Sequence, residues 1–350
     1  MDIKKLVRQN IQNLKPYTSA RDLYSDGILL DANENSMGST FTEIKDLNLN
    51  RYPDPHQNDL RELIGNHLNI AKENLFFGVG SDEIIDLLIR IFCEPKKDKI
   101  VIPEPTYGMY RVSADINNVR VVSVLLNDNI QIDTEEIEKN YSDDVKIIFL
   151  CSPNNPAGNL LNKDDVLELC KKYNSIIIVD EAYIDFTEDG SVIDEVKNYP
   201  NLVVMRTFSK AWGLAGVRLG YCAANEEIIK LLFKVKAPYN INTLTRFVLM
   251  KALKNEKLRN SYIKSIIDER ENLRQELGKL NGVLKIFDSD ANFLLIKCTD
   301  PKNVLQKLAN KGIIIRDRSD QPKLAGCLRI SIGTEEQNEI LLTALKEILK

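Results

Sequence analysis

The feature that most constrains the fold is a series of near-continuous apolar runs separated by helical or turn segments. The runs, rich in β-branched residues, are DKIVIPEP, VRVVSVLL, VKIIFLCSP, SIIIVDEAY and NLVVMRTFSK. Strands that are apolar throughout are buried on both faces, and their alternation with helices predicts a mostly parallel sheet covered on both sides. A further run, GVRLGYCAAN, is expected to join this sheet as an antiparallel strand.

The pattern changes after about Ala237. A long charged helical stretch from 243 to 280 precedes the short runs VLKIFDS, NFLLIKC, GIIIRDR and CLRISIG, with helical segments between and after them. This pattern predicts a smaller α+β domain with antiparallel strands. We therefore expect an N-terminal arm and part of the small domain over 1–44, a large domain over 45–240, and a connecting helix with the small C-terminal domain over 241–350.

Composition excludes several classes of protein. The 350 residues carry a net charge of −4, so no basic field exists to hold nucleic acid or an acidic membrane surface. No apolar run is long enough to span a membrane, and the N-terminus lacks the apolar core of a signal peptide. The six cysteines lack metal-ligand spacing and the histidines number only two, so we expect reduced thiols, no metal site and a cytoplasmic location.

Polar residues with chemical potential follow the apolar runs. Lys210 comes directly after one strand, flanked by hydroxyls and followed by glycines and an arginine in RTFSKAWGLAGVRLGY. Asp180 ends the strand SIIIV, at the edge of an α/β sheet where ligands bind. Taken singly, the lysine would be an ordinary exposed residue and the aspartate a helix cap. Their occurrence together favours a functional site.

Two loops add to this pattern. CSPNNPAGN follows another apolar strand and by itself is only a turn. GVGSDE joins a strand to a helix, and the free amides of that helix start suit a phosphate. It lacks the spacing and the lysine of a nucleotide-binding P-loop, which disfavours nucleotide binding.

The ordered blocks in this chain resemble those of a known family. They are LDANENS, NRYPDP, PTYGMY, CSPNNPAG, VDEAYIDF, TFSKAWGLAGVRLGY, APYNIN, IIIRD and CLRISIG. Together they resemble the fold-type I aminotransferases that depend on pyridoxal 5'-phosphate (PLP), and most closely the histidinol-phosphate aminotransferases, over essentially the whole chain. The resemblance implies an α/β fold with a mostly parallel seven-stranded sheet in the large domain, a smaller α+β domain, and a homodimer.

The resemblance also implies roles for individual residues. Lys210 would carry PLP as a Schiff base and, once freed by substrate, act as general base. Asp180 would keep the cofactor's ring nitrogen protonated. Tyr183 and Asn155 resemble the pair that hydrogen-bonds the phenolic oxygen, and Tyr107 the aromatic residue that stacks on the ring. Lys210, Asp180 and Tyr183 are the predicted catalytic residues.

The cofactor's phosphate requires several donors. The matching set is the backbone of Ser81 and Asp82, the hydroxyls of Thr207 and Ser209, and Arg218, whose guanidinium can bind two oxygens at once. Tyr52 resembles a tyrosine that reaches the phosphate bound to the neighbouring subunit. If so, each site is shared between two chains and the dimer is obligatory.

Four residues are predicted to bind substrate. Arg329 matches the family's carboxylate-binding arginine, a role that a guanidinium fork serves well. Arg316 resembles the arginine that helps hold the substrate's phosphate, and Arg318, two positions along, could compete for that role. Tyr17 and Asn33 belong to the arm that would close over the substrate.

The implied reaction belongs to histidine biosynthesis. It interconverts L-histidinol phosphate and 2-oxoglutarate with imidazole-acetol phosphate and L-glutamate. The alternatives are an aromatic or broad-range aminotransferase and a PLP decarboxylase of a phosphorylated amino acid, because the pocket and not the cofactor selects the bond that breaks. A non-catalytic PLP carrier is disfavoured, since Lys210, Asp180 and Arg329 are all present.

Overall fold

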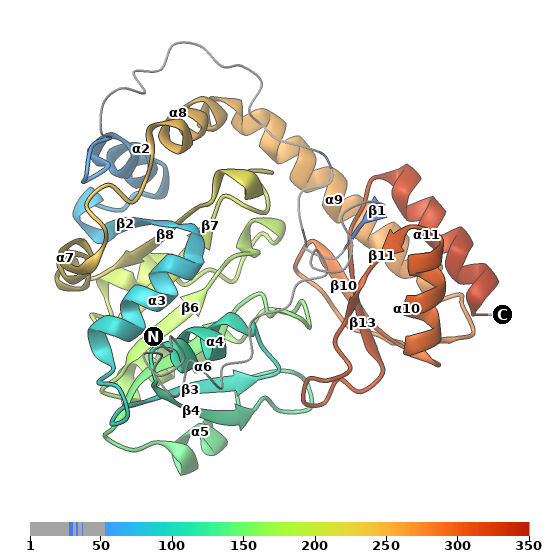
Figure 1. The fold of residues 1–350 in the computed structure, drawn as a ribbon, viewed down its shortest axis with the longest axis horizontal. Coiled ribbons are helices and arrows are strands. Elements are labelled where there is room, and N and C mark those ends of the chain that lie inside the picture. The colour runs from blue at the N-terminus through green and yellow to red at the C-terminus, as the bar shows by residue number, and fades with distance from the viewer. Residues whose placement is uncertain (1–27, 31–32, 34–36, 38–52, 350) are drawn as a thin grey trace, which may run out of the picture.

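A mixed seven-stranded sheet forms the centre of the larger part of the molecule (Figure 1). The structure, a computed structural model, describes residues 28–30, 33, 37 and 53–349. The strands are β2 (Leu75–Val79), β3 (Lys99–Glu104), β4 (Arg120–Leu125), β5 (Val145–Cys151), β6 (Ile176–Asp180), β7 (Leu202–Thr207) and β8 (Leu219–Ala224). Their order is β2-β8-β7-β6-β5-β3-β4, and β8 pairs antiparallel with both neighbours while β7, β6, β5, β3 and β4 pair in parallel. The predicted fold class and the antiparallel β8 are therefore confirmed.

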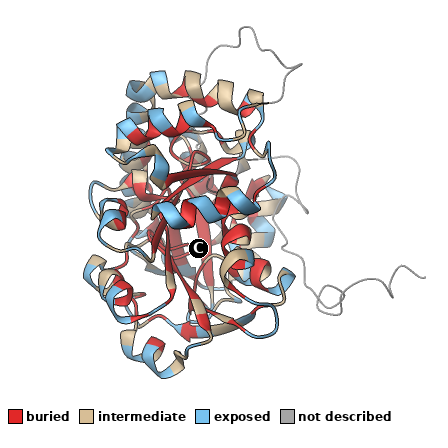
Figure 2. Ribbon diagram, turned by 90° about the vertical axis from the view of Figure 1, so that its left-hand side faces the viewer, coloured by how far each residue is buried: buried red, intermediate tan, exposed pale blue. Residues whose placement is uncertain are grey.

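Helices cover both faces of this sheet because alternate strand residues point to opposite sides. On one face Ile147 and Phe149 of β5 pack with α3 (Gly80–Phe92), α4 (Met109–Ile116) and α7 (Glu226–Val235). On the other face Ile148 and Leu150 belong to a core completed by α2 (Asn58–Leu68), α5 (Thr134–Asn140), α6 (Lys163–Lys172) and α8 (Thr243–Ala252). Figure 2 shows the buried residues concentrated along the strands and the exposed ones on the outward faces of the helices. Short 3₁₀ turns occur at Lys72–Asn74, Ile184–Phe186, Ile193–Lys197, Ala215–Val217 and Leu253–Asn255.

The C-terminal part has a core of its own. A four-stranded antiparallel sheet has the order β12 (Arg316–Asp317), β13 (Cys327–Ser331), β10 (Phe293–Cys298) and β9 (Val283–Ile286), as expected for an α+β unit. The helices α9 (Glu256–Leu277), α10 (Pro301–Asn310) and α11 (Glu335–Ile348) accompany it. The N-terminal strand β1 (Ile28–Leu29) pairs in parallel with β11 (Ile313–Ile314), and Leu30 is buried in this second core. An early segment of the chain thus packs with the C-terminal part.

The charged helical stretch expected over 243–280 is divided in two. α8 ends at Ala252, a 3₁₀ turn follows, and α9 begins at Glu256. α8 buries Leu249 in the core of the large sheet, whereas α9 buries Ile266 and Leu273 in the C-terminal core. The two helices thus contribute to different cores, and in Figure 1 α9 runs from α8 toward the smaller sheet.

Candidate active site

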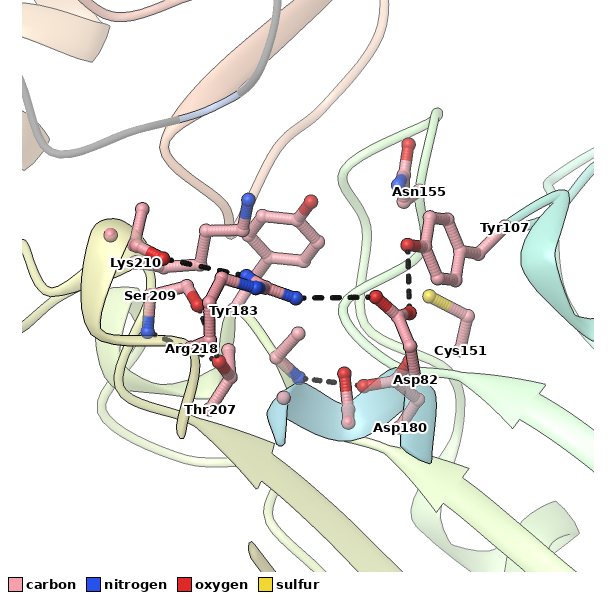
Figure 3. A pocket seen from close by; sticks show the side chains of 15 residues that line it. Asp82, Tyr107, Cys151, Asn155, Asp180, Tyr183, Thr207, Ser209, Lys210 and Arg218 are labelled. Carbon is pink, nitrogen blue, oxygen red and sulfur yellow. Dashed lines mark hydrogen bonds and ion pairs between the residues drawn. The ribbon is translucent and has the colours of Figure 1, made fainter. Parts of the chain in front are cut away.

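A cavity of about 340 Å³ lies where β5, β6 and β7 end and α3 begins (Figure 3). It is lined by Gly80, Ser81, Asp82, Tyr107, Cys151, Asn155, Asp180, Ala182, Tyr183, Thr207, Ser209, Lys210, Ala215, Gly216 and Arg218. The lining includes every residue predicted from the sequence to bind the cofactor except Tyr52. Tyr52 and Tyr17 lie outside the described residues.

One end of the cavity is a cradle for an anion. The first amides of α3, including those of Ser81 and Asp82, have no partner within the helix and carry the positive end of its dipole. The hydroxyls of Thr207, the last residue of β7, and of Ser209, just after that strand, lie 2.9 Å apart and also line the cavity. Arg218 completes the set, with Nη2 3.3 Å from Oδ2 of Asp82.

Two glycines allow these segments to approach one another. A Cβ on Gly80 would lie 2.6 Å from Nη2 of Arg218, and the φ of +71° at Gly80 also favours glycine. A Cβ on Gly220 would lie 2.6 Å from the backbone nitrogen of Ser81. The contact at Gly220 is with backbone and excludes any side chain, whereas a side chain at Gly80 would be strained by its positive φ and would displace the Arg218 guanidinium from the cradle.

The Asp180 carboxylate also lines the cavity and is buried. Oδ2 accepts a hydrogen bond of 2.8 Å from the hydroxyl of Tyr110, and Oδ1 accepts one of 3.2 Å from the amide of Ala182. Burial raises the pKa of Asp180 to about 6, although these two hydrogen bonds oppose the change. A positive charge placed beside this carboxylate would stabilise its ionised form.

Lys210 faces the ring of Tyr183. Its ammonium group is 5.6 Å from the centre of the Tyr183 ring, and both side chains line the cavity. Tyr183 is buried, and burial raises the pKa of its hydroxyl to about 12 while the charge of Arg329 and a hydrogen bond from Asn33 oppose that change. The Asn33 amide donates to the Tyr183 hydroxyl at 3.2 Å. The arm residue Asn33 therefore reaches this wall of the cavity.

Tyr107 forms another wall. Its hydroxyl donates to Oδ1 of Asp82 at 3.2 Å, and its ring meets that of Tyr110 edge to face at a centroid distance of 5.5 Å. Asp82 thereby contacts both Arg218 and Tyr107, as the dashed lines in Figure 3 show. The Asp82 side chain as well as its backbone shapes the cavity, which the sequence did not indicate.

The predicted substrate arginines lie on the small sheet. Arg329 of β13 is buried, and its Nη1 donates to Oδ1 of Asn155 at 2.5 Å, which joins the small sheet to the cavity lining. Arg316 of β12 is directly opposite Arg329 in the antiparallel register. Residues opposite one another point to the same face, so the two arginine side chains lie on one side of the small sheet. Arg318 lies beyond the end of β12 and donates its backbone amide to Cys327.

Comparisons with known proteins agree with this geometry. Residues 25–345 match the family model described as aminotransferase class I and II. The chain belongs to the class I and II aminotransferases. It is 46% identical over 346 residues to the histidinol-phosphate aminotransferase of Cytophaga hutchinsonii, covering 98% of each chain, and 45% identical to that of Flavobacterium psychrophilum, covering 99% of each. The crystal structure of the histidinol-phosphate aminotransferase from Clostridium acetobutylicum superimposes with a TM-score of 0.83 at 30% identity, covering 91% of this chain and 98% of that one.

Two features of this aminotransferase site were not predicted. Tyr110 is completely buried and contacts Asp180, yet in the sequence it is simply the second aromatic residue of PTYGMY. Glu181, which follows Asp180, forms a buried ion pair of 2.8 Å with Arg206 of β7. Its position beside a site residue was the only signal in the sequence, because the partner lies 25 positions away.

No group of residues suited to holding a metal ion occurs in the part of the chain that the structure describes. Among those residues no helix is long and apolar enough to cross a membrane. All six cysteines are free and buried.

Proposed function

We propose that this chain is a histidinol-phosphate aminotransferase that transfers the amino group between L-histidinol phosphate and 2-oxoglutarate. Relatives with that name match it over nearly their whole length. The structural observation that carries the proposal is the convergence of Lys210, an anion cradle and the buried Asp180 carboxylate in one cavity. An amine, a phosphate site and a carboxylate in that arrangement are what a PLP enzyme requires.

The cavity residues fit PLP. The cradle formed by the α3 amides, Thr207, Ser209 and Arg218 suits its phosphate, and the two glycines leave backbone donors exposed there. The buried Asp180 carboxylate suits a protonated ring nitrogen. Asn155 and Tyr183 offer donors for the phenolic oxygen, and the Tyr107 ring suits one face of the pyridine.

PLP, when bound, supplies an aldehyde that captures amino groups and a ring that withdraws electrons from the adjacent carbon. Lys210 would provide the amine that holds the cofactor. Its Nζ would also be the base that takes the proton from the substrate carbon that bears nitrogen. Asp180 would hold the charge that keeps the ring nitrogen protonated. The Tyr183 ring lies 5.6 Å from the Lys210 ammonium group and limits where that group can move.

Two different substrates must share one binding site. Glutamate brings carboxylates, whereas histidinol phosphate brings a phosphate. Arg329 suits either anion, because a guanidinium fork can bind two oxygens. Arg316, opposite Arg329 on the same sheet face, adds the second positive charge that a dianionic phosphate favours. The arginine pair is the feature that argues for a phosphorylated substrate over an aromatic amino acid.

Transamination assays test the proposal. The purified enzyme with PLP is supplied with glutamate and, separately, imidazole-acetol phosphate, phenylpyruvate or oxaloacetate, and 2-oxoglutarate formation is followed. We expect imidazole-acetol phosphate to be strongly preferred. Preference for phenylpyruvate would favour the aromatic aminotransferase, and release of carbon dioxide from a phosphorylated amino acid would favour the decarboxylase. Borohydride reduction and peptide mapping should label Lys210, and a label on another lysine would refute its role.

Replacing Arg316 tests the substrate assignment. Arg316→Ala removes a charge-assisted contact, which typically costs about tenfold or more in efficiency. The loss should be larger for histidinol phosphate than for glutamate when each half-reaction is followed by stopped-flow absorbance of the cofactor. Arg318→Ala is the control, since Arg318 lies outside β12. Equal losses for both substrates would remove Arg316 as the discriminating residue, and a selective loss in the control would transfer the role to Arg318.

We further propose a homodimer with shared active sites and a cytoplasmic location. A second cavity of about 390 Å³ shares Gly216 and Arg218 with the first, and Val79 and Leu244 on its lining are 43% and 49% exposed. Apolar exposure beside the phosphate cradle supports a second chain docking there. Sedimentation of the purified protein tests the dimer. A hybrid with Tyr52→Phe in one subunit and Lys210→Ala in the other tests the sharing: wild-type cofactor retention in the site that keeps Lys210 is expected.

A further inference from the structure

Tyr110 is an unusual residue for the apolar face of the large sheet. Its side chain is completely buried among the residues that join α3 and α4 to the sheet, and its ring stacks on Phe149 at a centroid distance of 4.7 Å. A phenylalanine would fill that volume without a polar atom. A hydroxyl carried into such surroundings costs free energy unless it finds a partner. The partner here is the Asp180 carboxylate, 2.8 Å away.

This contact gives Asp180 a fixed arrangement. The Tyr110 hydroxyl donates to Oδ2, while the Ala182 amide donates to Oδ1 from the loop after β6. The two donors approach different oxygens, so they restrict rotation of the carboxylate about its own bond. Tyr110 also touches Tyr107 edge to face, and Tyr107 is the proposed stacking residue. One side chain therefore supports both protein groups assigned to the cofactor ring.

We infer that Tyr110 is a positioning residue, whose hydroxyl holds the Asp180 carboxylate oriented and charged for the cofactor's ring nitrogen. The inference rests on the proposed function, since it assigns the ring nitrogen to Asp180. The role of Tyr110 concerns the proton shared between the Asp180 carboxylate and the ring nitrogen. A carboxylate that already accepts a hydrogen bond is a weaker base, so the proton shared with the ring stays on nitrogen. The hydrogen bond from Tyr110 also lowers the pKa of Asp180 against the effect of burial.

A double-mutant cycle separates this role from simple packing. Tyr110→Phe keeps the ring and removes only the hydroxyl, and Asp180→Asn removes the charge on which that hydroxyl acts. The cofactor-free proteins are titrated with PLP and binding is followed by fluorescence. The hydroxyl bonds Asp180 before PLP binds, so its effect on affinity comes from keeping the free carboxylate ionised and oriented, and losing it should weaken binding by up to roughly tenfold. We expect that loss for Tyr110→Phe in the wild-type background and little further loss in the Asp180→Asn background.

Tyr141→Phe is the matched control. It removes a hydroxyl that bonds Ser175 at 3.1 Å elsewhere in the same domain, and PLP affinity should remain unchanged. Equal losses for Tyr110→Phe in both backgrounds would show that the hydroxyl acts through packing and would overturn the inference, as would no loss at all. Failure of the wild-type protein to bind PLP would instead refute the proposed function.

Infrared spectroscopy gives an independent measurement if Tyr110→Phe does not fold. The carboxylate band of Asp180 in the cofactor-free wild-type protein is found by subtracting the spectrum of Asp180→Asn. With the Tyr110 hydroxyl as donor, Asp180 should be ionised at about pH 8, with its symmetric band shifted by the hydrogen bond. A protonated Asp180 at that pH, or an unshifted band, would overturn the inference.

Discussion

Replacing Asp180 by asparagine should make the cofactor-free protein more stable while it removes most of the activity. The reason is the burial of the carboxylate, which raises its pKa from 3.8 to about 6. A rise of that size corresponds to about 3 kcal/mol, because a tenfold change in an ionisation constant corresponds to about 1.4 kcal/mol. An amide of nearly the same shape carries no charge into the core. Its single oxygen can accept from Tyr110 or from the Ala182 amide but not from both, which offsets part of the gain.

The effect has a defined dependence on pH. Between pH 3.8 and about 6 the folded protein keeps the Asp180 proton that the unfolded chain has lost. The folded state then binds more protons, so its stability falls as pH rises through this window and stays reduced above it. The asparagine variant has no such titration. The stability difference should therefore move in the variant's favour by about 3 kcal/mol between about pH 4 and about pH 7.

Urea unfolding of the cofactor-free proteins, followed by circular dichroism at several pH values, measures the difference. Adding PLP should reverse the order, because a ligand that binds the folded wild-type protein more tightly stabilises it more. Transamination by the variant should fall well over tenfold, since a neutral amide cannot keep the ring nitrogen protonated. A variant less stable than wild type at about pH 8, or a difference that does not change with pH, would refute the reasoning.

Two further predictions concern the walls of the site. Gly80→Ala should weaken PLP binding about tenfold or more in a fluorescence titration, because the new methyl would collide with the Arg218 guanidinium at a φ that already disfavours alanine. Gly108→Ala is its control, with nothing within 4 Å of the added carbon, and equal affinities for the two variants would contradict the cradle. Glu181→Gln should lower the free energy of unfolding by about 3 kcal/mol or more, because Arg206 stays buried without its charged partner. If urea unfolding shows that the free energy of unfolding falls by less than about 1 kcal/mol, water screens the Glu181–Arg206 pair and the reasoning is wrong.

Much of the site could be predicted from the sequence because of where its residues stand. Asp180 and Lys210 come at or just after the ends of buried parallel strands, and Asn155 lies in a loop after a third. Parallel strands end at the same edge of a sheet, so residues at their ends must converge. The family resemblance then supplied the roles, which strand ends alone could not.

Other features could not be predicted because they depend on pairings between distant segments. Tyr110 and Asp180 are separated by 70 positions, and no local pattern links an aromatic residue of one helix to a carboxylate of one strand. The opposition of Arg316 and Arg329 follows from the register of β12 against β13, which a short strand does not specify by itself. The break between α8 and α9 similarly reflects two separate cores.

Asp180 and Glu181 are adjacent buried carboxylates, but only Glu181 forms an ion pair with a cation of this chain among the contacts described. Glu181 is paired with the Arg206 guanidinium and also accepts hydrogen bonds from Ser191 and the Val192 amide, so its charge is balanced within the chain. Asp180 instead accepts from two neutral donors, the Tyr110 hydroxyl and the Ala182 amide, and it faces the cavity. Neutral donors orient a carboxylate without neutralising it. The arrangement keeps the charge of Asp180 ready for a cation that arrives with a ligand, which is the property that a protonated cofactor ring requires.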